Sequence, residues 1–162
     1  MSERLFSILL VAAGFGAGLN AGLFFIFSNT VMTALGRMAP SGGIAAMQQI
    51  NIVIQNPVFF LAFFGTALLS VVLVAAALLG WLPNGAGWAL AGAVVYLAGI
   101  IAVTIVFNVP MNNALAAVDP ASAAGEALWQ DYLTRWTMWN HVRTVSGLIS
   151  SGAFILAIRM AA

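Results

Sequence analysis

The side chains best suited to chemistry in this chain stand near the ends of long apolar segments. They are amides together with the only histidine and one of the five arginines: Asn108, Asn112, Asn140, His141 and Arg143. Amide and guanidinium groups can donate hydrogen bonds to an oxyanion, and imidazole exchanges protons near neutral pH. Because unpaired polar groups at membrane depth cost free energy, this grouping predicts a functional site for a small molecule.

Four uncharged apolar segments position these residues, at about 5–31, 57–81, 88–109 and 144–160. Apolar residues make up 63% of the 162 residues and charged residues 6%, a balance outside that of soluble domains. A run of about 18 or more such residues is typical of a membrane-spanning helix, and the first run is too long for a signal-peptide core. We therefore predict an all-α fold, a four-helix transmembrane bundle that forms a single domain over residues 1–162.

The connections between the spans differ in character. Residues 82–87 form a tight turn rich in glycine and proline, so the second and third spans should be antiparallel neighbours. Residues 47–55 carry apolar side chains at helical spacing, and Asp119 with Pro120 is typical of a helix start. Pro110 should kink or end the third span. The pattern predicts up-down-up-down order, with short interfacial helices before spans 2 and 4.

This order brings the polar ends of the spans to one side of the membrane. Asn108 and Asn112 share a stripe of the third span, and Asn140 and Arg143 share a face of the fourth. His141 lies about 100° around the helix from Asn140, at the edge of that polar face. The asymmetry between the two ends of the bundle is the main functional signal of the topology.

The first span also has two sides of different composition. Asn20 shares a face with Phe24 and Phe27. The other side carries a ladder of small residues that suits close helix packing, within the chain or in a homo-oligomer: Gly14, Gly18 and Gly22.

Composition excludes several function classes. The chain has no cysteine, which removes disulfides and thiolate metal sites, and one histidine with four carboxylates gives a buried metal too few ligands. A net charge of +1 with scattered arginines makes no nucleic-acid surface. No G-x-S-x-G elbow and no strand-helix alternation is present. We expect no metal, no other cofactor and no nucleic-acid partner.

The membrane itself can be inferred from composition. The chain has no lysine but is rich in alanine and glycine, which predicts a GC-rich genome and a multi-pass protein of the bacterial cytoplasmic (inner) membrane. Arg4 and Arg159 would lie on one side and Arg37, Arg135 and Arg143 on the other. Two against three does not fix the orientation by the positive-inside rule.

Residues 108–115 (Asn-Val-Pro-Met-Asn-Asn-Ala-Leu) and 136–144 (Trp-Thr-Met-Trp-Asn-His-Val-Arg-Thr) resemble the paired signatures of the anthrone-oxygenase-like family of small four-helix membrane proteins. Residues 21–28, 47–51 and 55–57 agree with the same family, so the resemblance covers essentially the whole chain. It implies oxygenation of an anthrone, a phenolic tricyclic ketone, to an anthraquinone without metal or flavin.

That chemistry requires a base, donors around a developing oxyanion and a water-poor pocket. His141 is the candidate base. The candidate oxyanion donors are polar residues of the third and fourth spans: Arg143, Asn140, Asn108 and Asn112. Candidates to hold a flat, lipophilic aromatic substrate are Trp136, Trp139, Phe24, Phe27 and Asn20.

Two other interpretations remain open at the level of sequence. A non-enzymatic membrane module that binds or carries a lipophilic small molecule would use the same pocket and would need no base. In the other interpretation the amides only form hydrogen bonds between helices, and the tryptophans only anchor the spans at the membrane interface. The sequence alone does not separate an oxygenase from such a binder.

Overall fold

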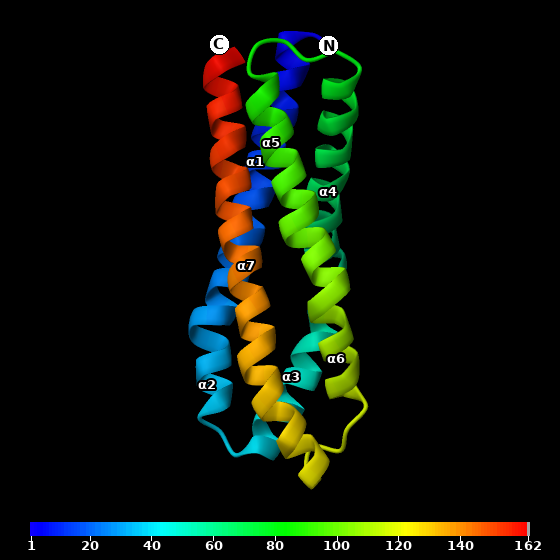
Figure 1. Ribbon diagram of the computed structural model, residues 1–162, viewed down its shortest axis with the longest axis vertical. Coiled ribbons are helices and arrows are strands. Elements are labelled where there is room, and N and C mark those ends of the chain that lie inside the picture. Colours follow the sequence, from blue (N-terminus) through cyan, green and yellow to red (C-terminus); the bar gives the residue numbers. More distant parts are fainter. Residues whose placement is uncertain (162) are drawn as a thin grey trace.

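The computed structural model describes residues 1–161 and is built from helices, with no strand among these residues (Figure 1). Four helices are long and apolar enough to cross a membrane: Glu3–Gly36, Pro57–Leu78, Ala86–Ala116 and Ala123–Ala161. The all-helical class and the four candidate membrane spans are thereby confirmed. Three of these helices are longer than the predicted spans.

The first long helix consists of α1 (Glu3–Ile26), a π-helical turn at Phe27–Val31 and α2 (Met32–Gly36). Its start is fixed by Ser2, whose side chain accepts a hydrogen bond from the backbone N–H of Leu5. With 34 residues the helix is roughly 50 Å long, against about 30 Å for a hydrocarbon core. It must therefore tilt or extend beyond the membrane.

The third long helix passes through Pro110 without ending. It comprises α5 (Ala86–Tyr96), π-helical turns at Leu97–Ala102 and Thr104–Asn108, and α6 (Val109–Ala116). In the second wide turn the N–H of Val109 bonds to the carbonyl of Thr104, five residues earlier. Proline is tolerated here because the wide turn lets Pro110 fall in the first turn of α6, where its missing N–H costs little. The helix thus continues to Ala116, past Pro110, where the sequence predicted a kink or an end.

The two segments expected as interfacial helices have different structures. α3 (Pro40–Val53) is a separate helix before α4 (Pro57–Leu78), and Asn56 caps α4 by accepting hydrogen bonds from two backbone N–H groups. Before the fourth span there is no separate helix, because α7 runs unbroken from Ala123 to Ala161. No proline follows Pro120, so nothing in the backbone interrupts α7.

The two ends of the bundle differ in structure (Figure 1). Both termini and the α4–α5 connection lie at one end, while α2, α3, α6 and the start of α7 lie at the other. α7 packs against α1 and α5, and α4 packs against α1 and α5. Separate core clusters occupy the two halves: one around Phe6, Phe63 and Phe154, the other around Ile44 and Trp129.

Two glycines of the predicted ladder pack against α7 of the same chain. Ser151 donates a hydrogen bond to the carbonyl oxygen of Gly14 at 3.0 Å, and a Cβ added at Gly18 would lie 3.4 Å from the Ser151 hydroxyl oxygen. A Cβ at Gly22 would meet nothing within 4 Å. The small residues of α1 therefore serve close helix packing within the chain at two of three positions.

Among the glycines at the α1–α7 contact, Gly147 has the least room for a side chain. A Cβ added there would lie 2.8 Å from the Cβ of Ala21 and 3.2 Å from the Ala17 carbonyl oxygen. We expect Gly147→Ala to destabilise the folded protein by about 1–3 kcal/mol through overpacking, seen as a lower melting temperature in detergent. Gly152→Ala is the matched control, since its Cβ would meet nothing within 4 Å. Equal melting temperatures for the two variants would contradict this packing.

Candidate active site

A cavity of about 610 Å³ lies in the half of the bundle that contains α3, and side chains of α1, α3, α4, α6 and α7 line it. Most of its wall is aromatic or aliphatic, including Phe24 and Phe27 from α1 and the adjoining turn, and Phe59 and Phe63 from α4. This volume lies within the range of pockets that hold drug-sized ligands. The cavity has room for a flat tricyclic molecule.

The only charged side chain in the cavity wall is Arg143, which is 6% exposed. Its guanidinium carbon lies 4.2 Å from the ring centroid of Phe24 and 5.3 Å from that of Trp136, an arrangement with cation–π attraction. One terminal nitrogen donates to the Thr104 hydroxyl at 3.3 Å, and the other donates to Oδ1 of Asn140. Nε has no hydrogen-bond partner in the described residues.

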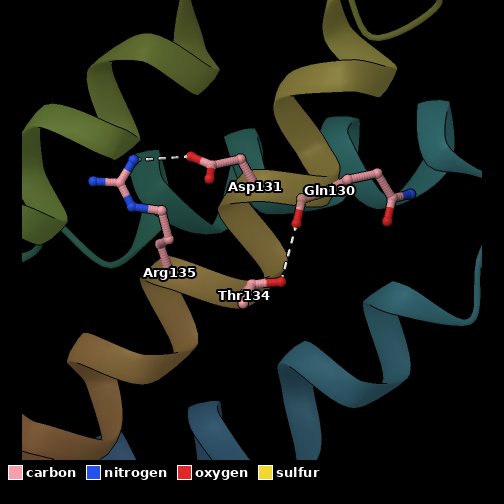
Figure 2. A network of polar contacts seen from close by, with 4 residues as sticks. All are labelled: Gln130, Asp131, Thr134 and Arg135. Atoms are coloured by element: carbon pink, nitrogen blue, oxygen red, sulfur yellow. Dashed lines mark hydrogen bonds and ion pairs between the residues drawn. The ribbon is translucent and has the colours of Figure 1, made fainter.

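No carboxylate neutralises Arg143. Within residues 1–161 the one ion pair joins Arg135 to Asp131 at 3.3 Å, and both of these side chains are exposed (Figure 2). Neutral partners leave the positive charge of Arg143 buried without a counter-ion, which is costly in a low-dielectric environment. An anionic ligand in the cavity would supply the missing negative charge.

Asn140 connects this guanidinium to α1. Its Nδ2 donates to the carbonyl oxygen of Phe24 at 2.6 Å while its Oδ1 accepts from Arg143. Both ends of the amide are therefore engaged, and Asn140 is fully buried. The two hydrogen bonds of the Asn140 side chain therefore hold Arg143 beside the ring of Phe24.

Asn112 is also held by two hydrogen bonds, and one of them comes from Trp136. Its Oδ1 accepts two hydrogen bonds of 2.8 Å, one from the hydroxyl of Tyr132 and one from Nε1 of Trp136. The rings of Tyr132 and Trp136 stack with centroids 5.7 Å apart. Tyr132 was missed as a site residue, although it precedes Trp136 by one helical turn, which is the available sequence signal.

The contribution of α3 and α4 to the cavity was not predicted from the sequence. Gln48 donates to the carbonyl oxygens of Leu115 and Val118 at 2.9 and 3.0 Å, which ties α3 to the end of α6. α3 contributes Ile50 and Asn51 to the cavity wall, and α4 contributes a patch of four phenylalanines: Phe59, Phe60, Phe63 and Phe64. The spacing of these phenylalanines on one helical face is a signal that could have identified them.

Some predicted site residues lie outside the cavity wall. Asn20 is buried and donates to the carbonyls of Gly16 and Ala62, and Asn108 donates to the carbonyl of Trp136 at 3.4 Å. Both amides thus form hydrogen bonds between or within helices.

Two predicted residues of α7 are also absent from the cavity wall. Trp139 stacks on Phe107 with a centroid distance of 3.6 Å, and His141 is exposed. Neither side chain lines the cavity. The structure brings together a smaller predicted set: Phe24, Phe27, Asn112, Trp136, Asn140 and Arg143.

Comparison with known proteins was informative at the family level. A family model described as anthrone oxygenase matches residues 59–153, which is more than half of the chain. The matched region runs from α4 into α7 and contains Asn112, Trp136, Asn140 and Arg143. No curated protein and no solved structure matches the chain. Together with the two C-terminal signatures, the match shows that this chain belongs to the anthrone oxygenase family.

Proposed function

We propose that this protein is a membrane oxygenase that oxidises a lipophilic phenolic aromatic of the anthrone type with dioxygen in the Arg143 cavity, without a metal or an organic cofactor. The observation that supports it is a buried guanidinium, flanked by Phe24 and Trp136, whose hydrogen-bond partners are all neutral. Such a site favours the anionic form of a flat aromatic ligand. Family membership supports the same substrate class.

The reaction can be written so that atoms and electrons balance. An anthrone loses one proton from the methylene group opposite its carbonyl and becomes an enolate, and Arg143 stabilises the negative oxygen. The enolate carbon gives an electron to dioxygen, a C–O bond forms, and protonation yields a hydroperoxide. Loss of water from the hydroperoxide leaves a second carbonyl. One anthrone and one dioxygen give one anthraquinone and one water, with the methylene carbon oxidised and both oxygen atoms reduced.

The chain's own contribution is electrostatic and steric. Arg143 has its Nε free and its two terminal nitrogens bound to Thr104 and Asn140, so the guanidinium is oriented before a ligand arrives. Preorganised donors of this kind lower the energy of a developing oxyanion without reorganisation during the reaction. The phenylalanine patch of α4 keeps the rest of the cavity poor in water.

The proton has an exit that does not require His141. Three polar residues of the wall are exposed, Gln49, Gln55 and Asn113, and we propose that water beside them accepts the methylene proton. Because His141 does not line the cavity, we expect His141→Ala to keep at least about half of the oxygen uptake measured with a supplied anthrone. A loss of most activity in this variant would assign the base to His141 and contradict the water route.

Oxygen consumption by the purified protein with a simple anthrone tests the proposed function. Anthrones oxidise slowly unaided, so empty detergent micelles must be measured beside the protein. We expect uptake above this background, with anthraquinone as the product and oxygen-18 from labelled dioxygen in its new carbonyl. Uptake equal to that of empty micelles would contradict the oxygenase function.

A second candidate, a membrane module that binds or carries a lipophilic small molecule, is favoured by one observation. Among residues 1–161, the cavity wall contains no histidine, carboxylate or tyrosine, the side chains that commonly act as a general base. Such a module would bind an anthrone or anthraquinone without accelerating its oxidation. Tight binding without oxygen uptake would identify it.

The membrane arrangement is part of the proposal. We infer that the chain is a single domain crossing the bacterial cytoplasmic membrane four times in up-down-up-down order, with α3 at the interface. The shared end of both termini and the α4–α5 connection supports this order (Figure 1). Exposed apolar side chains along α4, such as Leu61 and Leu78 at 76% and 77%, would face lipid.

A further inference from the structure

The amide of Asn112 has only one orientation that satisfies its neighbours. The indole N–H of Trp136 can donate a hydrogen bond but cannot accept one, so the atom 2.8 Å from it must be the oxygen. The Tyr132 hydroxyl donates to the same oxygen at 2.8 Å. The Nδ2 group therefore lies on the other side of the amide, and Asn112 itself lines the cavity.

This leaves two donors without protein partners around a single aromatic ring. Trp136 bonds to Asn112 through Nε1, and its ring centroid is 5.3 Å from the guanidinium carbon of Arg143. Nε of Arg143 and Nδ2 of Asn112 each lack an acceptor in the described residues. Because Arg143 and Asn112 both line the cavity, a ligand there would meet a charged guanidinium and a neutral amide donor, each in contact with Trp136.

We propose that Asn112 is a second oxygen-binding residue of this cavity, with Tyr132 as the residue that positions its amide. The ligand is then a planar aromatic molecule with oxygen acceptors at two positions of its ring system, as in a quinone or its hydroperoxide precursor. This inference rests on the proposed oxygenase function. Arg143 holds the enolate oxygen, and Asn112 donates to the oxygen that dioxygen delivers to the opposite ring carbon.

The infrared spectrum of bound 9,10-anthraquinone tests the inference directly, because this probe is neutral and does not react with oxygen. A hydrogen bond to a quinone carbonyl moves its stretching band to lower wavenumber. Free anthraquinone is symmetric and shows one carbonyl band, but hydrogen bonds from two different donors remove this symmetry, so two carbonyl bands can absorb. In the unaltered protein we expect both of them below the position of the single band found in empty micelles. In Asn112→Asp one band should return to that position, since an aspartate keeps the bonds from Tyr132 and Trp136 but has no hydrogen to donate.

Asn29→Asp is the matched control, because Asn29 is exposed and does not line the cavity. It adds the same charge and should leave both bands shifted. With an anthrone as substrate, Asn112→Asp should lower kcat at least about tenfold, and Asn29→Asp should leave kcat unchanged. Two shifted bands persisting in Asn112→Asp, or no binding of anthraquinone to the unaltered protein, would overturn the role of Asn112.

The positioning role of Tyr132 has its own control, since the chain has two tyrosines. Tyr132→Phe removes one of the two bonds that hold the amide. We expect the Asn112-dependent band to broaden, because an amide held by Trp136 alone moves more freely. Tyr96→Phe removes a hydroxyl that donates to the Phe63 carbonyl and should leave the band unchanged. An identical band in both variants would contradict the positioning role.

Failure of this inference can be separated from failure of the proposed function. If oxygen uptake requires Arg143 but the carbonyl bands are unchanged in Asn112→Asp, the proposed function stands and only the role of Asn112 as a second donor is rejected. An Asn112-dependent band in a protein that takes up no oxygen would keep the two-donor site and assign it to a quinone-binding module.

Discussion

Arg143→Gln is expected to reduce anthrone-dependent oxygen uptake about 100-fold or more, to near the rate in empty micelles. Removing one preorganised donor from an oxyanion site typically costs about 100- to 1,000-fold in kcat, and Arg143 supplies both a donor and the only charge of the cavity. Arg135→Gln is the matched control on the same helix, because Arg135 is exposed and pairs with Asp131 outside the cavity. Equal loss in both variants, or full activity in Arg143→Gln, would contradict the assignment.

The same substitution should not cost stability. Arg143 is buried with no counter-ion, and replacing a buried charge by a neutral side chain is often neutral or stabilising. We therefore expect the ligand-free Arg143→Gln protein to melt at the same temperature as the unaltered protein or above it. Loss of function without loss of stability is the pattern of a binding residue, because active sites commonly reduce the stability of the fold.

Asn140→Asp is the second change with a large expected effect. It places a carboxylate beside the guanidinium, where Oδ1 of Asn140 already accepts a hydrogen bond from Arg143. The new carboxylate neutralises Arg143, which is the role that we assign to the anionic ligand. An anionic ligand entering the cavity would then be repelled by this carboxylate, at a cost of several kcal/mol. We expect affinity for the anion of 2-hydroxyanthraquinone, measured by absorbance titration, to fall about 100-fold or more.

Asn29→Asp again controls for the added charge, because Asn29 is exposed and does not line the cavity. Because Asn140→Asp loses the bond from Nδ2 to the Phe24 carbonyl, a monodisperse elution profile must first show that the variant is folded. Retained affinity for the anion in folded Asn140→Asp would show that the ligand charge does not lie against Arg143. That outcome would contradict the electrostatic basis of the proposed function.

The fold could be predicted from sequence mainly because its signal is local. Runs of apolar residues define four candidate spans, and the confirmed helices contain all four of them except the last residues of the second run. The end of the third span could not be placed, because continuation past Pro110 depends on π-helical turns that place the proline in a tolerant position. The continuity of α7 was likewise hidden by the polar composition of its first half.

The site could be predicted only in part, for a similar reason. Helical phase places Asn140 and Arg143 on one face and the structure retains that pairing, whereas Asn20, which shares a face with Phe24, bonds to backbone carbonyls instead. Which polar groups meet the cavity depends on contacts between distant segments. The seating of α3 through Gln48 is such a contact, and no local pattern reports it.

We propose above all that the Arg143 cavity binds the oxyanion of a flat aromatic molecule. Absorbance spectra of 2-hydroxyanthraquinone test it most directly, because the anion of this dye absorbs at longer wavelength than its neutral form. We expect the protein to bind the dye as its anion at a pH where the dye in empty micelles is neutral, and Arg143→Gln to abolish this shift. A dye that stays neutral when bound, or that ionises equally well in Arg143→Gln, would contradict the account.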